Sequence, residues 1–309
     1  MIVYTHNDCL KKFNGQNHPE RKERLISIIK TLKSSPELKI NFKEAPIAKM
    51  SEIILVHPKD HIDKIFSNIP KEGLRGVEKE PYADTLLCPD SKNAILRSCG
   101  AGIAAVDDLM NKNERVFCAI RPPGHHAETI RANGFCFINN IAVAARYLQK
   151  KYKIKKVAII DFDVHHGNGT QEIFYNHQQV LYVSSHQYPF YPGTGASSEK
   201  GKYNNILNIP LDAGTTSHEF LNAYEVVFTK LKEFKPDFIL LSSGFDAHQN
   251  DPLAQINLQS KDFAELTKRI LSLSKELCAS KIVSILEGGY DLEALQESTM
   301  LHVQSLLQH

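Results

Sequence analysis

The sequence contains no tryptophan, only six cysteines and no long apolar segment. Its cysteines form no Cys-x-x-Cys pair and follow no regular spacing, which in a chain of 309 residues favours reduced thiols over a disulfide framework. No apolar run approaches the roughly 20 residues that a membrane-spanning helix needs. The first residues also lack a basic segment followed by a long apolar stretch, so no secretory signal is visible. We therefore expect a soluble, cytoplasmic protein.

Charge of neither sign is in large excess. The chain has 37 Lys and Arg residues against 35 Asp and Glu residues, which gives a formal net charge of +2. This balance argues against a nucleic-acid binder that works through a large basic field. The densest basic run, residues 150–156, is typical of a solvated helix C-terminus, where the helix dipole favours positive charge. We expect no direct binding to nucleic acid or membrane, and the composition leaves the oligomeric state open.

Short apolar runs alternate with amphipathic segments along the whole chain, and no repeat or flexible linker divides it. The expected strands are residues 115–120, 156–161, 180–184, 238–242 and 281–286. The expected helices are residues 19–32, 91–110, 139–151, 217–234, 260–278 and 291–307. Short apolar runs without clean alternation are typical of strands buried on both faces of a parallel sheet. We predict one doubly wound α/β domain over residues 1–309, with a mainly parallel central sheet flanked by helices.

Four polar loops each follow directly on an expected strand. They contain residues 121–126, 163–167, 244–248 and 287–291. In open parallel sheets, ligands bind at the carboxyl ends of the strands. The four loops are therefore expected to meet at one edge of the sheet, although they are far apart in the sequence.

Three acidic or imidazole side chains, Asp161, Asp163 and His165, alternate where an expected strand ends. An extended chain puts all three on one face, and buried charges of this kind need a partner or a metal. Asp163, His165 and Asp246 supply two carboxylates and one imidazole, which leaves coordination positions open for water and substrate. The alternative is a simple carboxylate–imidazole pair. Zinc fits this donor set, which also suits ferrous iron or cobalt.

Two adjacent histidines, His125 and His126, follow a Pro-Pro-Gly turn. Imidazole titrates near neutral pH, so a rigidly held pair suits proton transfer. Asp161 and Asn168 can orient the two imidazole rings by hydrogen bonding. We assign Asp161 to this orienting role and not to metal binding.

Tyr290 follows Gly288 and Gly289, where the missing side chains leave room for a phenol to reach a substrate. Its hydroxyl can donate a hydrogen bond to an oxyanion opposite the metal. A Gly-Gly-Tyr turn alone is more often structural, so this role depends on the other loops.

These motifs closely resemble those of the zinc-dependent histone deacetylase family. The matching segments are residues 14–24, 121–127, 161–171, 244–248 and 286–290, in that order along nearly the whole chain. Asn168 and Glu287 resemble the class II branch and its bacterial relatives. The resemblance implies an arginase-type α/β fold and a hydrolase that removes acetyl or other acyl groups from lysine side chains of proteins.

The resemblance also implies roles for individual residues. Asp163, His165 and Asp246 would bind zinc, and ferrous iron is the alternative metal. His126 would be the general base, oriented by Asn168, with His125 as a companion imidazole held by Asp161. Tyr290 would polarise the acyl carbonyl. A potassium ion would bind through Asp161, Asp163, His165, Ser184 and Ser185.

The expected partner is an acylated lysine of a protein or peptide, entering through a narrow tunnel. Phe135 and Tyr191 match the two aromatic walls of this tunnel, and the second wall is more often Phe. The residues implied to bind substrate are Gly134, Phe135, Tyr191, Leu253, Gly288 and Asp84.

Three other functions fit the sequence less well. An arginase-like ureohydrolase needs two metals, but His166 and His248 stand where further acidic ligands would be required. An acetylpolyamine amidohydrolase tends to carry an acidic residue at the rim, where this chain has Leu253. A non-catalytic acyl-lysine binding module would have lost His126 or Tyr290, and both are present.

Overall fold

A single eight-stranded sheet forms the centre of the molecule. The computed structural model describes residues 1–79 and 84–308. The strands of the sheet are β1 (Ile2–Thr5), β2 (Asn41–Glu44), β5 (Val116–Cys118), β6 (Val157–Asp161), β7 (Val180–Gln187), β8 (Ile206–Leu211), β9 (Phe238–Ser243) and β10 (Ile282–Leu286). Their order is β2-β1-β5-β10-β9-β6-β7-β8, and every neighbouring pair is parallel. The predicted doubly wound α/β fold is confirmed.

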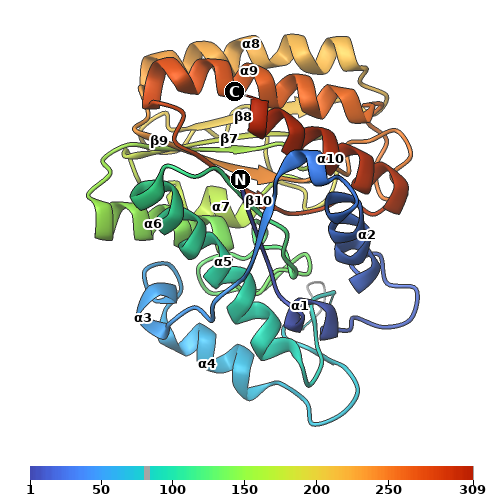
Figure 1. Ribbon diagram of the computed structural model, residues 1–309. Coiled ribbons are helices and arrows are strands. Elements are labelled where there is room, and N and C mark those ends of the chain that lie inside the picture. Colours follow the sequence, from blue (N-terminus) through green and yellow to red (C-terminus); the bar gives the residue numbers. More distant parts are fainter. Residues whose placement is uncertain (80–83, 309) are drawn as a thin grey trace.

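Helices cover both faces of this sheet (Figure 1). One face packs against α2 (Lys22–Lys33), α8 (Ser217–Phe234), α9 (Ser260–Cys278) and α10 (Leu292–Gln308), through one large apolar cluster. The other face packs against α5 (Ser91–Lys112), α6 (Asn140–Tyr152) and α7 (Asn168–Phe174), through a second cluster. None of the helices in the described part of the chain is long and apolar enough to span a membrane.

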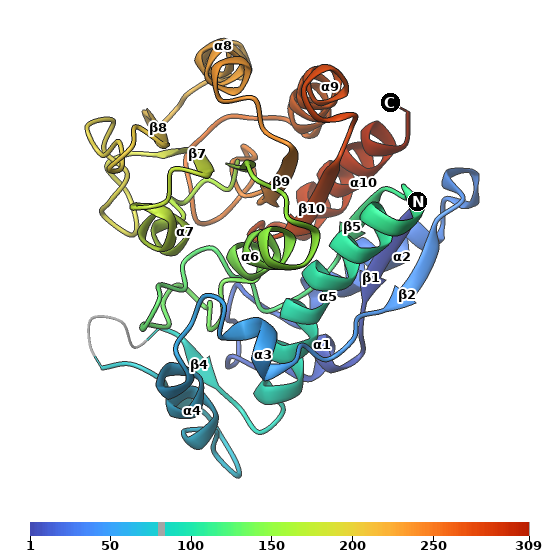
Figure 2. The same cartoon turned by 90° about the vertical axis from the view of Figure 1, so that its left-hand side faces the viewer.

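A smaller layer extends from the second face beyond α5. It contains α3 (Met50–Ile53), α4 (Lys59–Ser67) and the antiparallel pair β3 (Arg75–Gly76) and β4 (Leu86–Leu87). This layer has its own apolar cluster, shared with α5 and with the segment that precedes α6. Figure 2 shows α3, α4 and β4 of this layer near α1 (Asp8–Lys11). A short 3₁₀ helix, η1 (Pro36–Leu38), connects α2 to β2.

The predicted strands all appear, but β1, β2 and β8 of the central sheet and the short pair β3 and β4 were not predicted. β2 and β8 are the two edge strands of the sheet, and β2 is partly exposed along its whole length. Pro210 lies within β8, and proline is tolerated in a strand only at an edge or a bulge. β2 therefore buries little apolar surface and leaves a weak pattern in the sequence, whereas β1 is buried but is only four residues long.

The four loops that carry polar motifs follow β5, β6, β9 and β10. These strands are neighbours at the centre of the sheet, in the order β5-β10-β9-β6. Because all four run in parallel, their carboxyl ends open on the same edge. The tertiary structure therefore brings the four loops together, as the sequence predicted.

Candidate active site

Three buried side chains form a compact cluster at the carboxyl ends of the central strands. Asp163, His165 and Asp246 each present one ligand atom, and these atoms all lie within 4.8 Å of one another. His165 Nδ1 lies 3.1 Å from Asp163 Oδ1 and 3.1 Å from Asp246 Oδ2. We call this set the metal cluster. Two carboxylates and one imidazole with open positions are the donor set of a catalytic metal site.

The backbone around the metal cluster holds the carboxylates in place. Gly288 N–H donates to Asp163 Oδ2 at 2.7 Å, and Val164 N–H donates to Asp246 Oδ1 at 2.9 Å. A Cβ atom at Gly288 would approach Asp246 Oδ2 to 2.1 Å, and one at Gly244 would approach Asp163 Oδ2 to 2.1 Å. Glycine is therefore required at both positions for the loops to come so close to the carboxylates.

The electrostatics of the metal cluster favour a bound cation. Burial disfavours a charged imidazole, but the hydrogen bonds to Asp163 and Asp246 outweigh it and raise the pKa of His165 to about 10. The two carboxylates therefore favour positive charge at this position. A divalent cation can supply that charge and neutralise both carboxylates at once, so these residues fit a resident metal ion.

The histidine pair lies beside the metal cluster, each ring with its own partner. His125 Nδ1 lies 3.0 Å from Asp161 Oδ2, and His126 Nδ1 lies 2.8 Å from Asn168 Oδ1. The two ring centroids are 4.0 Å apart. Asp161 therefore contacts His125, and among the described residues it is not one of the clustered ligands.

The two imidazoles have opposite tendencies to carry charge. Burial opposes protonation of both, but the charge of Asp161 raises the pKa of His125 to about 10. For His126, burial and then the charges of His125 and His165 lower the pKa well below its usual value. Environments that push two neighbouring pKa values apart are typical of an acid–base pair.

A narrow cavity of about 260 Å³ opens above these groups. Its lining residues are Asp84, His126, Gly134, Phe135, His165, Phe190, Tyr191, Leu253 and Tyr290. We call it the site cavity. It contains nearly all the residues that the sequence predicted to bind substrate, and Gly288 lies beneath it against the carboxylates. Phe190 was not predicted as a site residue, because nothing in the sequence distinguishes it from its neighbour Tyr191. In the structure its ring stacks on His165, with centroids 5.6 Å apart.

A tight turn presents Phe135 to the site cavity. Asn133 and Cys136 exchange two backbone hydrogen bonds of 3.0 and 2.8 Å, and the central residues Gly134 and Phe135 have φ values of 52° and 67°. Positive φ is unusual for an aromatic residue, and two in succession define a type I′ turn. The Phe135 N–H also donates to Thr85 Oγ1 at 3.0 Å, which ties this turn to the loop of Asp84.

The opposite wall carries a polar group at its rim. Tyr191 Oη lies 2.7 Å from Asn133 Oδ1 and 3.2 Å from Asp84 Oδ2. Its ring meets the ring of His126 edge-on at 5.3 Å. The hydroxyl therefore connects the aromatic wall to an acidic rim, a link that a phenylalanine would not make.

Tyr290 is held from both sides of the site cavity. Its backbone N–H donates to Asp251 Oδ2 at 2.7 Å, and Asp251 Oδ1 accepts from the Leu253 N–H at 2.9 Å. The Arg24 guanidinium lies 4.9 Å from the centre of the Tyr290 ring and donates to the carbonyls of Gly289 and Glu287 at 2.5 and 2.6 Å. Arg24 and Asp251 were not predicted as site residues, since their partners are backbone groups.

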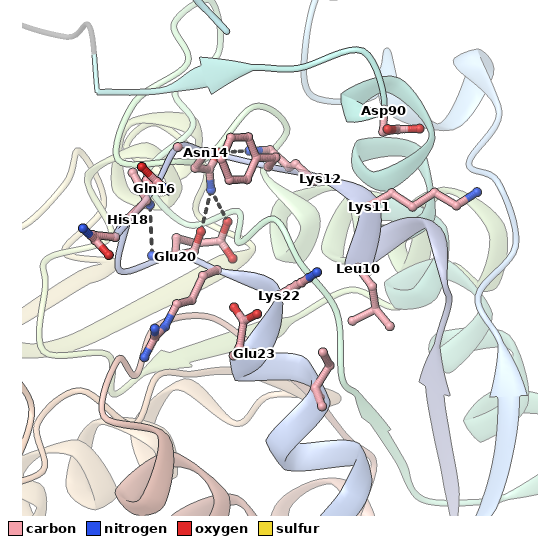
Figure 3. A pocket seen from close by; sticks show the side chains of 15 residues that line it. Leu10, Lys11, Lys12, Asn14, Gln16, His18, Glu20, Lys22, Glu23 and Asp90 are labelled. Atoms are coloured by element: carbon pink, nitrogen blue, oxygen red, sulfur yellow. Dashed lines mark hydrogen bonds between the residues drawn. The ribbon is translucent and has the colours of Figure 1, made fainter. Parts of the chain in front are cut away.

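A larger cavity of about 680 Å³ lies elsewhere, against the loop before α2 (Figure 3). Figure 3 shows the Asn14 amide pointing at Glu20, to which it donates at 2.6 Å. Glu20 in turn accepts from Arg121 Nε at 2.6 Å, at the start of the His-His loop. No residue of the metal cluster lines this cavity. Residues of its wall contact the active-site loops from outside: Glu20 binds Arg121, and the His18 ring lies edge-on to Phe135 with centroids 4.6 Å apart.

The residues expected to bind potassium lie below the histidine pair. Asp161 on β6 is paired in register with Ser184 on β7, and Asp161 Oδ2 accepts from Tyr182 Oη at 2.9 Å. Ser184 Oγ lies 2.9 Å from His186 Nδ1, and Ser185 Oγ lies 2.7 Å from the hydroxyl of Tyr224. The structure brings Asp161 and Ser184 together, whereas the side chain of Ser185 is bonded to α8.

Comparison with known proteins gives the family of this chain. A family model described as the histone deacetylase domain matches residues 18–306. The chain belongs to the histone deacetylase family. A probable deacetylase of Archaeoglobus fulgidus is 35% identical over 98% of this chain and 84% of its own length. Histone deacetylase 10, chloroplastic, of Oryza sativa subsp. japonica is 38% identical over 92% of this chain and 68% of its own length.

A solved structure of this family agrees with the fold. The crystal structure of the HDA15 HD domain superposes with a TM-score of 0.91 at 32% identity, covering 100% of this chain and 91% of that chain. The predicted family, the arginase-like fold and the deacetylase class of hydrolase are thereby confirmed. Zinc dependence is typical of histone deacetylases, and the metal cluster offers the donors that such a metal needs.

Proposed function

We propose that this histone deacetylase family member removes acetyl or other acyl groups from lysine side chains of proteins or peptides. The observation that supports this proposal is the site cavity of about 260 Å³, whose lining includes Phe135, Tyr191, His165 and Tyr290. A flexible methylene chain suits an aromatic-walled passage, and the acyl end would then lie between the metal cluster and Tyr290. We also propose that residues 1–309 form one catalytic domain.

Asp163, His165 and Asp246 would hold the resident metal, for which zinc is our first choice and ferrous iron the alternative. When bound there, a divalent cation supplies Lewis acidity to the acyl carbonyl and lowers the pKa of a water molecule. His126 accepts a proton from the attacking water through Nε2, since Nδ1 faces Asn168. Tyr290 donates a hydrogen bond to the carbonyl oxygen as it becomes an oxyanion. The proton on His126 then passes to the leaving lysine amine.

His125 would stabilise this reaction electrostatically. Burial lowers its pKa, but the charges of Asp161 and then Asp163 raise it to about 10, which favours the charged form. We further propose a structural potassium ion at Asp161 and Ser184, with the neighbouring Ser185 and the backbone carbonyls of Asp163 and His165. Asp161 would then serve both the ion and His125.

A second candidate is a deacylase of acetylated polyamines. The carboxylate of Asp84 lines the site cavity, and an acidic rim can bind the second amine of such a substrate. Leu253 is the apolar residue on the same rim, where a dedicated acidic group would be expected for this activity.

The test is turnover of a panel of acyl-lysine peptides and acetylpolyamines by zinc-loaded and iron-loaded protein, in potassium and in sodium buffer. We expect hydrolysis of acetyl-lysine peptides, and a loss of about 10²-fold or more in kcat for both His126→Ala and Tyr290→Phe. The exposed His218→Ala and Tyr203→Phe are matched controls that should keep full activity. Turnover of polyamines alone would overturn the protein substrate, and full activity of His126→Ala would overturn the mechanism.

A further inference from the structure

A short turn beside the histidine pair carries a carboxylate that faces Asn168. The backbone N–H of Glu128 donates to the carbonyl of Arg131 at 2.9 Å, which closes the turn. Glu128 Oε1 accepts from Asn168 Nδ2 at 2.8 Å, and Glu128 Oε2 accepts from Arg131 Nε at 2.9 Å. The Glu128 side chain is 17% exposed, so both of its oxygen atoms are directed into this network.

The position of this carboxylate decides how the Asn168 amide is turned. An ionised carboxylate only accepts hydrogen bonds, so the amide must present its NH₂ group to Glu128. The carbonyl oxygen of Asn168 then faces His126 Nδ1, at 2.8 Å. A carbonyl oxygen also only accepts, so His126 must carry its proton on Nδ1. Its other nitrogen, Nε2, keeps a free lone pair toward the site cavity.

We propose that Glu128 is a positioning residue that selects the Nδ1–H tautomer of His126 by fixing the orientation of the Asn168 amide. Asn168 alone cannot make this selection, because an amide has a donor end and an acceptor end of nearly equal shape. If the Asn168 amide were turned the other way, its carbonyl oxygen would face the Glu128 carboxylate, and both groups only accept hydrogen bonds. That orientation would also place the proton of His126 on Nε2, where the imidazole cannot accept one from water.

The turn itself is anchored independently of this contact. Glu172 Oε2 on α7 accepts from the backbone N–H of Thr129 at 2.9 Å and from its hydroxyl at 2.7 Å. A Cβ atom at Gly169 would approach the carbonyl oxygen of Ala127 to 2.2 Å, so the chain before the turn packs directly on α7. An isosteric change at Glu128 should therefore leave the turn in place and alter only the pattern of donors and acceptors.

This inference rests on the proposed base role of His126 and is tested by a double-mutant cycle in the zinc-loaded protein. Glu128→Gln can offer its NH₂ group to Asn168 while its oxygen keeps Arg131, so the Asn168 amide turns over. We expect kcat to fall by on the order of 10²-fold, with KM within about twofold, since a misplaced tautomer removes general-base catalysis. Asn168→Asp should also lose activity, because two carboxylates then face each other.

The double variant should recover most of the loss. In Glu128→Gln with Asn168→Asp, the new carboxylate accepts from both the new amide and His126 Nδ1, which restores the complementary pattern. We expect kcat within about fivefold of the wild-type value, far above the product of the two single losses. Losses that simply multiply would overturn the proposal. Glu172→Gln is the matched control on the same turn, and a loss equal to that of Glu128→Gln would show that turn rigidity is responsible.

The tautomer is measured directly by ¹⁵N NMR of the imidazole nitrogens, with the His126 signals assigned from their absence in His126→Asn. We expect a protonated Nδ1 in the wild type and the double variant, and a protonated Nε2 in Glu128→Gln. An unchanged tautomer in Glu128→Gln would overturn the positioning role. A changed tautomer with unchanged turnover would instead overturn the base role of His126, so the two failures are distinguishable.

Discussion

His125 and His126 are adjacent histidines, but a different hydrogen-bonding partner gives each ring a different tendency to carry charge. His125 faces the carboxylate of Asp161, and His126 faces the amide of Asn168. A carboxylate stabilises an imidazolium ion, whereas an amide carbonyl only orients a neutral ring. The division between a charged and a neutral imidazole therefore depends on which partner the fold delivers to each ring.

Gly134 packs directly against the His126 ring and leaves no room for a side chain. Its φ is +52°, and a Cβ atom there would approach the His126 ring to 2.3 Å at Cδ2 and 2.7 Å at Cγ. We expect Gly134→Ala to displace His126 and to lower kcat about 10²-fold, a typical cost of misplacing a catalytic group by about 1 Å. Steady-state kinetics on the acetyl-lysine peptide measures this effect.

Gly73→Ala is the control for backbone strain alone. Gly73 has a φ of +69°, but nothing lies within 4 Å of a Cβ atom at that position. Gly73→Ala should lose about 1 kcal/mol in the free energy of unfolding through backbone strain alone, and Gly134→Ala should lose more because of the added overlap with the His126 ring. Equal kinetic losses in the two variants would contradict a specific contact between position 134 and His126.

At the level of elements, the loop after β9 and the loop after β10 are joined by one carboxylate. Asp251 accepts from the backbone N–H groups of Leu253 and Tyr290. In Asp251→Asn one oxygen becomes an NH₂ group, which must face a backbone donor. We expect one of the two hydrogen bonds to break and kcat/KM to fall by about tenfold, the kinetic equivalent of ~1.4 kcal/mol.

Asp262→Asn is the matched control for this exchange. Asp262 accepts from the Gln259 N–H at 2.7 Å at the start of α9, away from the site cavity. Its replacement should lower the thermal midpoint and leave kcat/KM unchanged, because it weakens only this helix cap and a hydrogen bond from the Ser217 hydroxyl, both away from the site cavity. If Asp251→Asn behaves in the same way, the link between the two loops does not position Tyr290.

The elements differ in how well the sequence predicted them. α8 and α9 were predicted to the residue, because each has strong helical periodicity and clear ends. α7 was missed, since its seven residues overlap the Gly-Asn-Gly segment of the metal loop and bury polar side chains. A short helix that serves a site lacks the apolar stripe by which helices are recognised.

At the scale of the whole molecule, buried neutral histidines couple stability to pH. The ring of His302 is fully buried between Thr267 Oγ1 and Ser284 Oγ, at 2.7 and 2.8 Å. Burial lowers its pKa to about 3. The folded protein thus resists protonation that the unfolded chain accepts below its ordinary value of 6.5. Stability is fully present above pH 6.5 and is lost as the pH falls toward 3.

We expect His302 to account for about 2 kcal/mol of the decrease in unfolding free energy between pH 7 and pH 5. Urea denaturation of the wild type and His302→Gln at both pH values measures this contribution, because glutamine does not titrate. The pH-dependent decrease should be smaller by that amount in the variant. The exposed His218→Gln should show the full wild-type decrease, and an equal decrease in His302→Gln would refute the assignment.

Much of this protein follows from its sequence alone. Parallel strands buried on both faces need continuous apolar runs, so β5, β6, β7, β9 and β10 were predicted from short apolar segments. Polar residues at the ends of such strands are costly without partners, and this cost alone marks Asp163, His165 and Asp246 as candidate metal ligands. The family could likewise be inferred, because its motifs occur in order along the chain.

Only the tertiary structure decided which side chains meet. The order β5-β10-β9-β6 makes neighbours of strands that lie far apart in the sequence, and no local pattern encodes that order. The family resemblance already implied that Asp161 contacts His125 and that Asn168 contacts His126, but the contact of Glu128 with Asn168 became visible only in the structure. These hydrogen bonds join residues that are far apart in the sequence. A hydrogen bond forms only at a short distance and a suitable angle, so the folded chain must first bring the two groups together.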